Sequence, residues 1–550
     1  MSVAVQENTK KVFLSGVLLL TLSTLLVKLI GLIYKIPMLS YLGSEGMGYF
    51  NSAYEIYALF CVISTAGLPV ALSVLISGAI ARGERGSVRR IYRSALTVFW
   101  IIGALGSVLM LLLADRFCGW IQSEGAYFSI LAIAPTLLFV CLSSALRGYF
   151  QGYQRMLPTA ISQVIESLGK LVFGLLLAGW ALERGYDTAR VSAFAGIGLT
   201  LGTMLSFFYL WIEKRRFCPN EEENCEAAVS RADVFRRLAR LSLPMTLGAS
   251  LVSFTKLIDM AMILRRLQAI GYSETAANEA YGGYTTLALS VFGLLPSLVN
   301  SVALPLVPML SAAIASGDRA RQSEMIRASY RLTALLAIPA ALGVAAYAHP
   351  VLSLLFAGEE QVVALAAPLL SALGVSVFLS CMITATGSVL HAYQAVNRPT
   401  LSMLAGALVK ILSAYFLIGN PQIALMGAPI STFLCDAVVV LLNLRFSDRL
   451  CRVEGLGPVF WKPLLAAALS VGGSYSLYLW VMLRFGASSM LTLMAISAAG
   501  ALYLLFACLT GMLEEADFSL LPMGKQICKI LKQLRLLPRE NNRSDFGAGE

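Results

Sequence analysis

Long runs of apolar residues recur along the whole chain, separated by short polar stretches. A helix needs about 20 mostly apolar residues to cross a bilayer, and these runs are long enough. Only 13% of the residues are charged, against roughly 25% in an average soluble domain. The sequence therefore predicts an all-α integral membrane protein with fourteen transmembrane helices, at 12–34, 48–78, 92–114, 126–147, 158–182, 190–212, 241–264, 284–312, 328–348, 364–390, 400–419, 425–446, 462–483 and 488–511.

Basic residues indicate how these helices are oriented. Most of the 42 Lys and Arg fall in loops on one side of the membrane, with clusters at 82–93, 214–216, 231–240, 319–331 and 445–452. Short loops rich in Lys and Arg stay in the cytoplasm. We therefore expect both termini to be cytoplasmic, and the net charge of +11 requires no nucleic-acid partner.

Cysteine and histidine usage excludes several kinds of site. The ten cysteines are scattered and predict no disulfide framework. Cys218 and Cys225 lie seven residues apart without the second ligand pair of a zinc site. The two histidines are His349 and His391, and no nucleotide motif stands out. The sequence implies no metal, no cofactor and no catalytic residue.

The chain contains an internal duplication. Residues 77–85 (SGAIARGER) reappear at 311–319 (SAAIASGDR), and Lys28-Leu-Ile matches Lys256-Leu-Ile at nearly the same offset. Each of the first six spans then corresponds to the span six places later, so both copies enter the membrane in the same direction. This pattern predicts two parallel six-helix repeats around a central cavity, followed by two extra C-terminal helices.

The duplication divides the chain into five predicted parts. They are an N-lobe, a cytoplasmic linker, a C-lobe, the last two spans and a cytoplasmic tail, at 1–212, 213–240, 241–450, 451–513 and 514–550. Within the linker, Ser230-Arg-Ala-Asp233 is a helix-start pattern. In the tail, apolar residues at helical spacing alternate with lysines, which predicts a basic amphipathic helix on the inner leaflet.

Four lysines lie deep inside apolar runs, at Lys28, Lys170, Lys256 and Lys410. A lysine at the centre of a membrane helix costs roughly 2.5 to 3.5 kcal/mol, so such residues mark functional sites. The duplication pairs Lys28 with Lys256 in the outer half of the bilayer, and Lys170 with Lys410 near its midplane. Lys35 follows Lys28 by two helical turns on nearly the same face. We predict that these lysines line one cavity and bind an anionic substrate.

Acidic residues within the spans allow a second interpretation; they are Glu55, Glu166, Asp259 and Asp436. Glu166 precedes Lys170 by one helical turn, a spacing at which side chains pair. Asp259 follows Lys256 by three residues, which is also a pairing distance. These acids therefore offer local ion pairs with the lysines, or sites that couple transport to an ion.

Prolines interrupt several of the predicted spans. Pro69 lies in the second span, and Pro296 and Pro305 lie in the eighth, which is its counterpart in the duplication. A proline removes a backbone hydrogen bond and permits a helix to bend. We expect these three residues to act as hinges, although prolines are also tolerated in membrane helices as simple kinks.

Four sequence blocks resemble a known family. GLIYKIPMLSYLGSEGMGYF at 31–50 is followed by GLPVALS at 67–73, and RGYFQGYQRMLPT at 147–159 is followed by SQVIE at 162–166. They resemble the stage V sporulation protein B family of polysaccharide exporters. That family belongs to the multidrug/oligosaccharidyl-lipid/polysaccharide superfamily and is related to lipid II flippases. The resemblance covers essentially the whole chain.

The resemblance implies a flippase of the bacterial plasma membrane. Its substrate would be a polyprenyl-diphosphate-linked sugar, such as the peptidoglycan precursor lipid II, moved to the outer leaflet by alternating access. Its partners would be membrane lipids and cell-wall synthesis proteins. In lipid II flippases the first helix carries arginines that line the cavity; Lys28 matches one such position, whereas Tyr34 stands where a second is expected and Lys35 is the substitute. The diphosphate would then contact the intramembrane lysines.

Two other functions remain open from the sequence. A cation-coupled multidrug or toxin antiporter of the same superfamily would use Glu55, Asp259 and Asp436 as its cation site, which the lysine pairs disfavour. An integral-membrane glycan enzyme would need catalytic acids or histidines in large outer loops, and the outer loops here are short.

Overall fold

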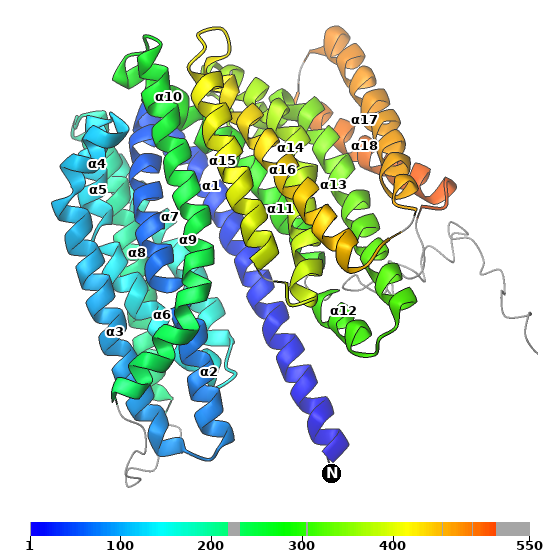
Figure 1. Ribbon diagram of the computed structural model, residues 1–550. Coiled ribbons are helices and arrows are strands. Elements are labelled where there is room, and N and C mark those ends of the chain that lie inside the picture. Colours follow the sequence, from blue (N-terminus) through cyan, green and yellow to red (C-terminus); the bar gives the residue numbers. More distant parts are fainter. Residues whose placement is uncertain are drawn as a thin grey trace, which may run out of the picture. The chain divides into compact units, whose positions relative to one another are not determined.

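A computed structural model describes residues 2–217, 231–303, 306–395, 397–453, 455–486 and 488–512 of the chain (Figure 1). Every regular element in these residues is a helix. Twelve helical segments among them are long and apolar enough to cross a membrane. The predicted all-α membrane class is confirmed, while the count of fourteen spans and the duplicated arrangement stay predictions. The predicted tail at 514–550 lies outside the described residues.

The helices form two compact units, and the first contains the residues up to Val291 together with Glu359–Ala366 and Ile411–Ser431. Its complete elements are α1 (Ser2–Thr65), α2 (Leu68–Ala81), α3 (Arg85–Leu112), α4 (Ala114–Ile121), η1 (Glu124–Ala126), α5 (Tyr127–Ile133), α6 (Thr136–Gly152), α7 (Leu157–Glu183), α8 (Thr188–Arg216), α9 (Arg231–Ala269), α10 (Glu274–Gly283), η2 (Tyr284–Ala288) and η3 (Ala424–Met426).

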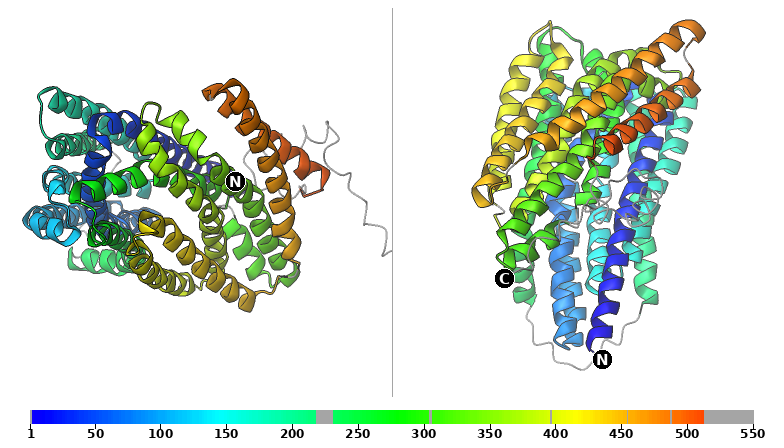
Figure 2. Two further views of the ribbon diagram at one scale, coloured as in Figure 1. Left: turned by 90° about the horizontal axis from the view of Figure 1, so that it is seen from above. Right: turned by 90° about the vertical axis from the view of Figure 1, so that its right-hand side faces the viewer.

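The second unit contains α12, α13, α17 and α18 and most of four further helices. Its elements are α11 (Leu289–Ala303), α12 (Leu306–Ala315), α13 (Arg319–Leu355), α14 (Glu360–Ala392), α15 (Asn397–Ile418), α16 (Gly427–Leu450), α17 (Gly457–Phe485) and α18 (Ser489–Leu509). Helices α17 and α18 lie side by side in both views of Figure 2. The division into lobes expected from the duplication stays a prediction.

The first two predicted spans are joined within one long helix, α1, which is broken in direction at Gly43. Gly43 has φ 65° and ψ 176°, a backbone conformation that is essentially restricted to glycine. The second span is interrupted again between α1 and α2, immediately before Pro69. Pro69 is therefore the second residue of a new helix, a position where proline costs little.

The eighth predicted span differs from the expectation in its start and its regularity. It begins at Glu274, ten residues earlier than predicted, where the Ser273 side chain caps the helix by accepting a hydrogen bond from the Ala276 N–H at 3.1 Å. The helix then passes through a π-helical turn, η2. Pro296 lies inside α11, whereas Pro305 lies outside the described residues. Single π-turns in membrane helices expose backbone carbonyls and often mark functional sites.

Glycine contacts bring α7 and α8 close together, and the two helices lie side by side in Figure 1. A Cβ atom added at Gly169 would approach Gly202 Cα to 2.6 Å, so these backbones nearly touch. Gly198 lies equally close to Gly174 one helical turn further along. Small residues allow such close approach between membrane helices. This packing gives α7, which carries Glu166 and Lys170, a fixed position.

Residues 231–240, expected within the linker, form the first turns of α9. The helix begins at Arg231, the second residue of the helix-start pattern, and has Asp233, the last residue of that pattern, in its first turn. Residues 218–230 of the predicted linker lie outside the described residues, and so do Cys218 and Cys225.

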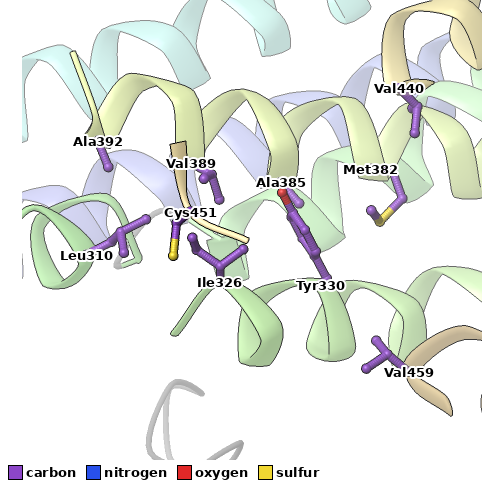
Figure 3. Close-up of a cluster of buried hydrophobic side chains, with 10 residues drawn as sticks. All are labelled: Leu310, Ile326, Tyr330, Met382, Ala385, Val389, Ala392, Val440, Cys451 and Val459. Carbon is purple, nitrogen blue, oxygen red and sulfur yellow. The ribbon is translucent and has the colours of Figure 1, made fainter. Parts of the chain in front are cut away.

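The second unit is held together by packing of α13 against its neighbours. One buried cluster joins side chains of α12, α13, α14, α16 and α17 (Figure 3). At its centre Tyr330 is 1% exposed, and its hydroxyl donates a 3.1 Å hydrogen bond to Ser447 Oγ. This bond satisfies the one polar atom that the ring carries into the core.

Candidate functional site

Lys28 of α1 and Lys256 of α9 form the first of two basic clusters in the first unit. The two helices pack against each other, and both side chains are exposed. The ammonium groups are close enough to repel each other. Two like charges close together on apolar helices are unfavourable against hydrocarbon, and an anion beside them would stabilise both. The structure thus brings one predicted lysine pair together.

Lys35 is anchored to the π-helical turn. Its ammonium donates hydrogen bonds to Ser290 Oγ at 2.7 Å and to the Thr285 carbonyl at 3.2 Å. The Ser290 hydroxyl donates to the same carbonyl at 3.2 Å. Thr285 lies in the π-turn, where the Leu289 N–H donates to the Tyr284 carbonyl, and such turns inside α-helices often mark functional sites.

Asn51 fixes the other part of α1, beyond Gly43, to the same turn. Its side-chain amide donates to Thr285 Oγ1 at 2.9 Å and to Thr286 Oγ1 at 3.0 Å. Asn51 and Thr286 are both buried. Lys35 and Asn51 therefore bind η2 from both sides of the Gly43 bend, which sets the position of α1 in this unit.

Lys170 of α7 lies among three aromatic rings. Its Nζ is 5.0 Å from the ring centroid of Tyr34, 5.5 Å from that of Phe50 and 4.9 Å from that of Tyr54. The faces of aromatic rings attract cations at these distances. All three rings belong to α1, so the lysine of one helix is held by the aromatic surface of another.

Lys35, Lys170 and Glu55 form the second basic cluster. The Lys35 ammonium is repelled by the ammonium of Lys170 and attracted by the carboxylate of Glu55. Within the first unit the lysine beside Lys170 is Lys35. Lys410 belongs to the second unit, and its pairing with Lys170 stays a prediction. Glu166 also attracts Lys170 but is paired with Arg147, so the three cations Lys35, Lys170 and Arg147 face the two acids Glu55 and Glu166. The surroundings of Lys170 therefore keep one excess positive charge.

Glu166 forms an ion pair with Arg147 of α6. Arg147 Nη2 lies 2.7 Å from Glu166 Oε2, with side-chain exposures of 13% and 21%. Arg147 also donates to Ser162 Oγ at 2.9 Å and to Ser206 Oγ at 3.2 Å. The local pair of Glu166 with Lys170 that its spacing suggests is not the contact formed. Arg147 was not among the predicted site residues, because the predicted span ended at this residue. The aromatic residues Tyr149 and Phe150 indicate that the helix continues to Gly152, which places Arg147 inside it.

The remaining predicted acids lie in two places. Asp259 of α9 is half-buried in the first unit. Its carboxylate and that of Glu55 both lie close enough to Tyr281 to interact with it electrostatically. Asp436 belongs to the second unit, where its carboxylate accepts a 2.6 Å hydrogen bond from Ser380 Oγ and attracts Lys410. Among the described residues no group of three or more His, Cys, Asp or Glu side chains is arranged to hold a metal ion.

The sequence pattern of the polysaccharide biosynthesis protein family matches residues 13–314, more than half of the chain. The chain belongs to this family. The MatE family pattern matches residues 244–416, which overlaps the second repeat expected from the duplication. The polysaccharide biosynthesis family and MatE are both placed in the multidrug/oligosaccharidyl-lipid/polysaccharide superfamily, as predicted.

Curated relatives of this family member come from Bacillus subtilis (strain 168). Stage V sporulation protein B is 24% identical over 94% of this chain and 98% of its own length. Lipid II flippase MurJ is 24% identical over 76% of this chain and 78% of its own length. The resemblance noted in the sequence is confirmed.

Solved structures show the same fold. An inward closed conformation of lipid II flippase MurJ matches with a TM-score of 0.67 at 16% identity, covering 90% of this chain and 98% of the other. An inward-facing multidrug resistance MATE transporter matches with a TM-score of 0.61 at 14% identity, covering 78% and 96%. This polysaccharide biosynthesis family member is therefore a multi-pass membrane transporter or flippase rather than an enzyme.

Proposed function

We propose that the protein flips a polyprenyl-diphosphate-linked sugar, of the lipid II class, from the cytoplasmic to the outer leaflet. The family and the similarity to a lipid II flippase support a lipid-linked substrate. Alternating access would expose the binding cavity first to one side and then to the other. We place the protein in the bacterial plasma membrane with both termini in the cytoplasm, consistent with its Lys and Arg distribution.

The observation that carries this proposal is the exposed pair of Lys28 and Lys256. Their mutual repulsion is relieved when an anion lies between or beside them. A diphosphate is the part of the substrate that is hardest to move through hydrocarbon, and two ammonium groups can neutralise it. A cationic drug would instead increase the repulsion, which disfavours the antiporter alternative.

The other intramembrane lysines supply further proposed contacts for the diphosphate. Lys35 and Lys170 form the second cluster of the first unit, and we propose that they contact the diphosphate at another stage of transport. We propose the same role for Lys410 of the second unit, which lies near Asp436. Pro69, Pro296 and Pro305 are proposed hinges of the alternating-access movement.

Reconstituted transport tests the proposal. The Lys28→Ala/Lys256→Ala double variant in liposomes is expected to lose at least about 90% of lipid II flipping, because removing charge-assisted contacts of about 1.5–3 kcal/mol lowers affinity tenfold or more. The matched control is Lys462→Ala/Arg484→Ala, which removes two cations from α17 in the second unit. The control is expected to transport normally.

Three substrates separate the alternatives. Lipid II, another polyprenyl-diphosphate sugar and a cationic drug are offered to the same liposomes. Movement of the drug but of neither lipid would establish the antiporter function and refute the proposal. Normal lipid flipping by a correctly inserted double alanine variant would refute the role of the lysine pair.

A further inference from the structure

We infer that Arg147 is a positioning residue that keeps the positive charge of Lys170 available to an anionic substrate by binding Glu166, so that this acid does not pair directly with Lys170. The inference rests on the proposed function, because it assigns Arg147 a role in recognising the polyprenyl diphosphate. Arg147 would not touch the substrate. It would act through Glu166, the acid with which Lys170 shares a helix face.

The position of Glu166 makes such a role necessary. Glu166 and Lys170 lie one turn apart on α7, the spacing at which opposite charges pair on a helix. In the low dielectric of a membrane protein interior such a pair is strong and would neutralise the lysine. An acid in this position therefore competes with any anionic substrate for Lys170.

Arg147 removes this competition by its geometry. Its guanidinium binds Glu166 Oε2 at 2.7 Å, and its other donors reach Ser162 and Ser206. These three acceptors come from α7 and α8, so the guanidinium is fixed by both helices. Arginine suits this position because its planar group donates in several directions at once and stays charged.

The backbones of α7 and α8 restrict how far Glu166 can move. A Cβ atom at Gly202 would lie 2.8 Å from the Glu166 carbonyl oxygen and 2.5 Å from the Lys170 amide nitrogen. The turn that carries both side chains is therefore packed directly on α8. A change of partner for Glu166 would then take place by rotation of its side chain, and the ion pair with Arg147 opposes that rotation.

The direct contacts of the Lys170 ammonium are aromatic rings, while Glu166 attracts it without forming an ion pair with it. Tyr34, Phe50 and Tyr54 stabilise its ammonium through their faces, and rings, unlike a carboxylate, do not neutralise it. Together with Lys35 the site then keeps an excess of positive charge. The aromatic contacts fix the position of the Lys170 ammonium, and the Arg147–Glu166 pair keeps this ammonium from being neutralised by a direct ion pair.

Binding of undecaprenyl diphosphate to the purified full-length protein, measured by native mass spectrometry, tests the inference. Arg147→Gln releases Glu166 to pair with Lys170, and we expect affinity to fall about tenfold or more. Arg147→Gln/Glu166→Gln removes the competing acid as well, and we expect affinity to return to within about threefold of wild type. This rescue would show that Arg147 acts through Glu166, and comparing the unfolding temperatures of the two variants separates an effect on binding from the loss of a structural ion pair.

A second double-mutant cycle, which combines substitutions of Arg147 and Lys170, tests whether Arg147 affects binding through Lys170. In a Lys170→Gln background, Arg147→Gln is expected to lower the affinity no further. The control is Arg155→Gln, which breaks an ion pair of 3.8 Å with Glu213 in the same unit and is expected to leave affinity unchanged. Thermal unfolding of each variant shows that it is folded.

The outcomes distinguish the two claims. If wild-type protein does not bind undecaprenyl diphosphate, the proposed function fails and this inference with it. If wild-type protein binds but Arg147→Gln binds equally well, or the double variant is not rescued, only the role of Arg147 is refuted. A further loss of affinity in the Lys170→Gln background would also refute it.

Discussion

Asn51 Nδ2 donates a 2.9 Å hydrogen bond to Thr285 Oγ1 and so joins α1, beyond its bend at Gly43, to the π-helical turn η2. The same amide reaches Thr286 Oγ1 at 3.0 Å. Because Lys35 binds η2 from the other side of the bend, this turn is a common attachment point for both parts of α1.

Removing the Asn51 amide should destabilise the protein. Asn51→Ala leaves the buried hydroxyl of Thr286 without this donor, and we expect a loss of about 1–3 kcal/mol in the free energy of unfolding. Thermal unfolding in detergent measures the effect. Ser40→Ala is the control, since Ser40 is exposed on the same helix and bonds only to its own turn. An equal melting temperature for both variants would contradict the expectation.

Gly202→Ala should be poorly tolerated because α7 leaves no room for a methyl group. The added Cβ would lie 2.8 Å from the Glu166 carbonyl oxygen. Overpacking of this kind costs about 1–3 kcal/mol. Gly248→Ala on α9 is the control, since no atom lies within 4 Å of its Cβ position. The prediction fails if the two variants have the same unfolding temperature and yield.

Gly43→Ala should strain the bend in α1. A residue with a side chain at φ 65° and ψ 176° costs about 1–3 kcal/mol. Gly31→Ala on the same helix is the control, because its Cβ position is also open but its backbone has no positive φ. Measured unfolding temperatures should fall for Gly43→Ala and stay level or rise for Gly31→Ala. A similar response of both variants would show that the bend tolerates a side chain.

Cys118 should resist alkylation in the folded protein. It lies in α4, between two candidate spans, where burial first and then the Asp115, Glu274 and Glu124 carboxylates raise the pKa of its thiol to about 12. The reactive thiolate therefore stays scarce at pH 8 and increases only as the pH approaches 12. Mass spectrometry after iodoacetamide treatment should find Cys118 modified only in denatured protein.

An engineered cysteine provides the comparison for this experiment. Gly119 is the exposed neighbour of Cys118. Gly119→Cys in a Cys118→Ser background should react rapidly at pH 8. Equal rates for Cys118 in wild-type protein and for the engineered cysteine would contradict the buried position of Cys118.

Much of the architecture follows from local sequence. A bilayer provides no water for backbone N–H and C=O groups, so an apolar run of sufficient length must form a helix. The pairing of Lys28 with Lys256 was likewise predictable, because the predicted duplication matches the two residues to each other. Irregular features were not predictable in the same way. The single-helix connection through Gly43 and the π-turn at η2 depend on contacts between helices.

The partner of Glu166 shows where local reasoning ends. On α7 the nearest cation along the sequence is Lys170, and the spacing alone favours that pair. The structure instead gives Glu166 to Arg147 of α6 and Lys170 to the rings of α1. Either Lys170 or Arg147 would give the Glu166 carboxylate a cationic partner, and only the packing of α6, α7 and α8 selects Arg147.

The sequence by itself determined that this protein is a helical membrane transporter of the polysaccharide biosynthesis family with lysines deep inside its helices. These properties depend on the composition and order of residues within single segments. The tertiary structure decided which charges neighbour each other, because helix side chains reach only a few ångströms and helix packing sets which of them meet. The excess of positive charge around Lys35 and Lys170 is a consequence of that packing.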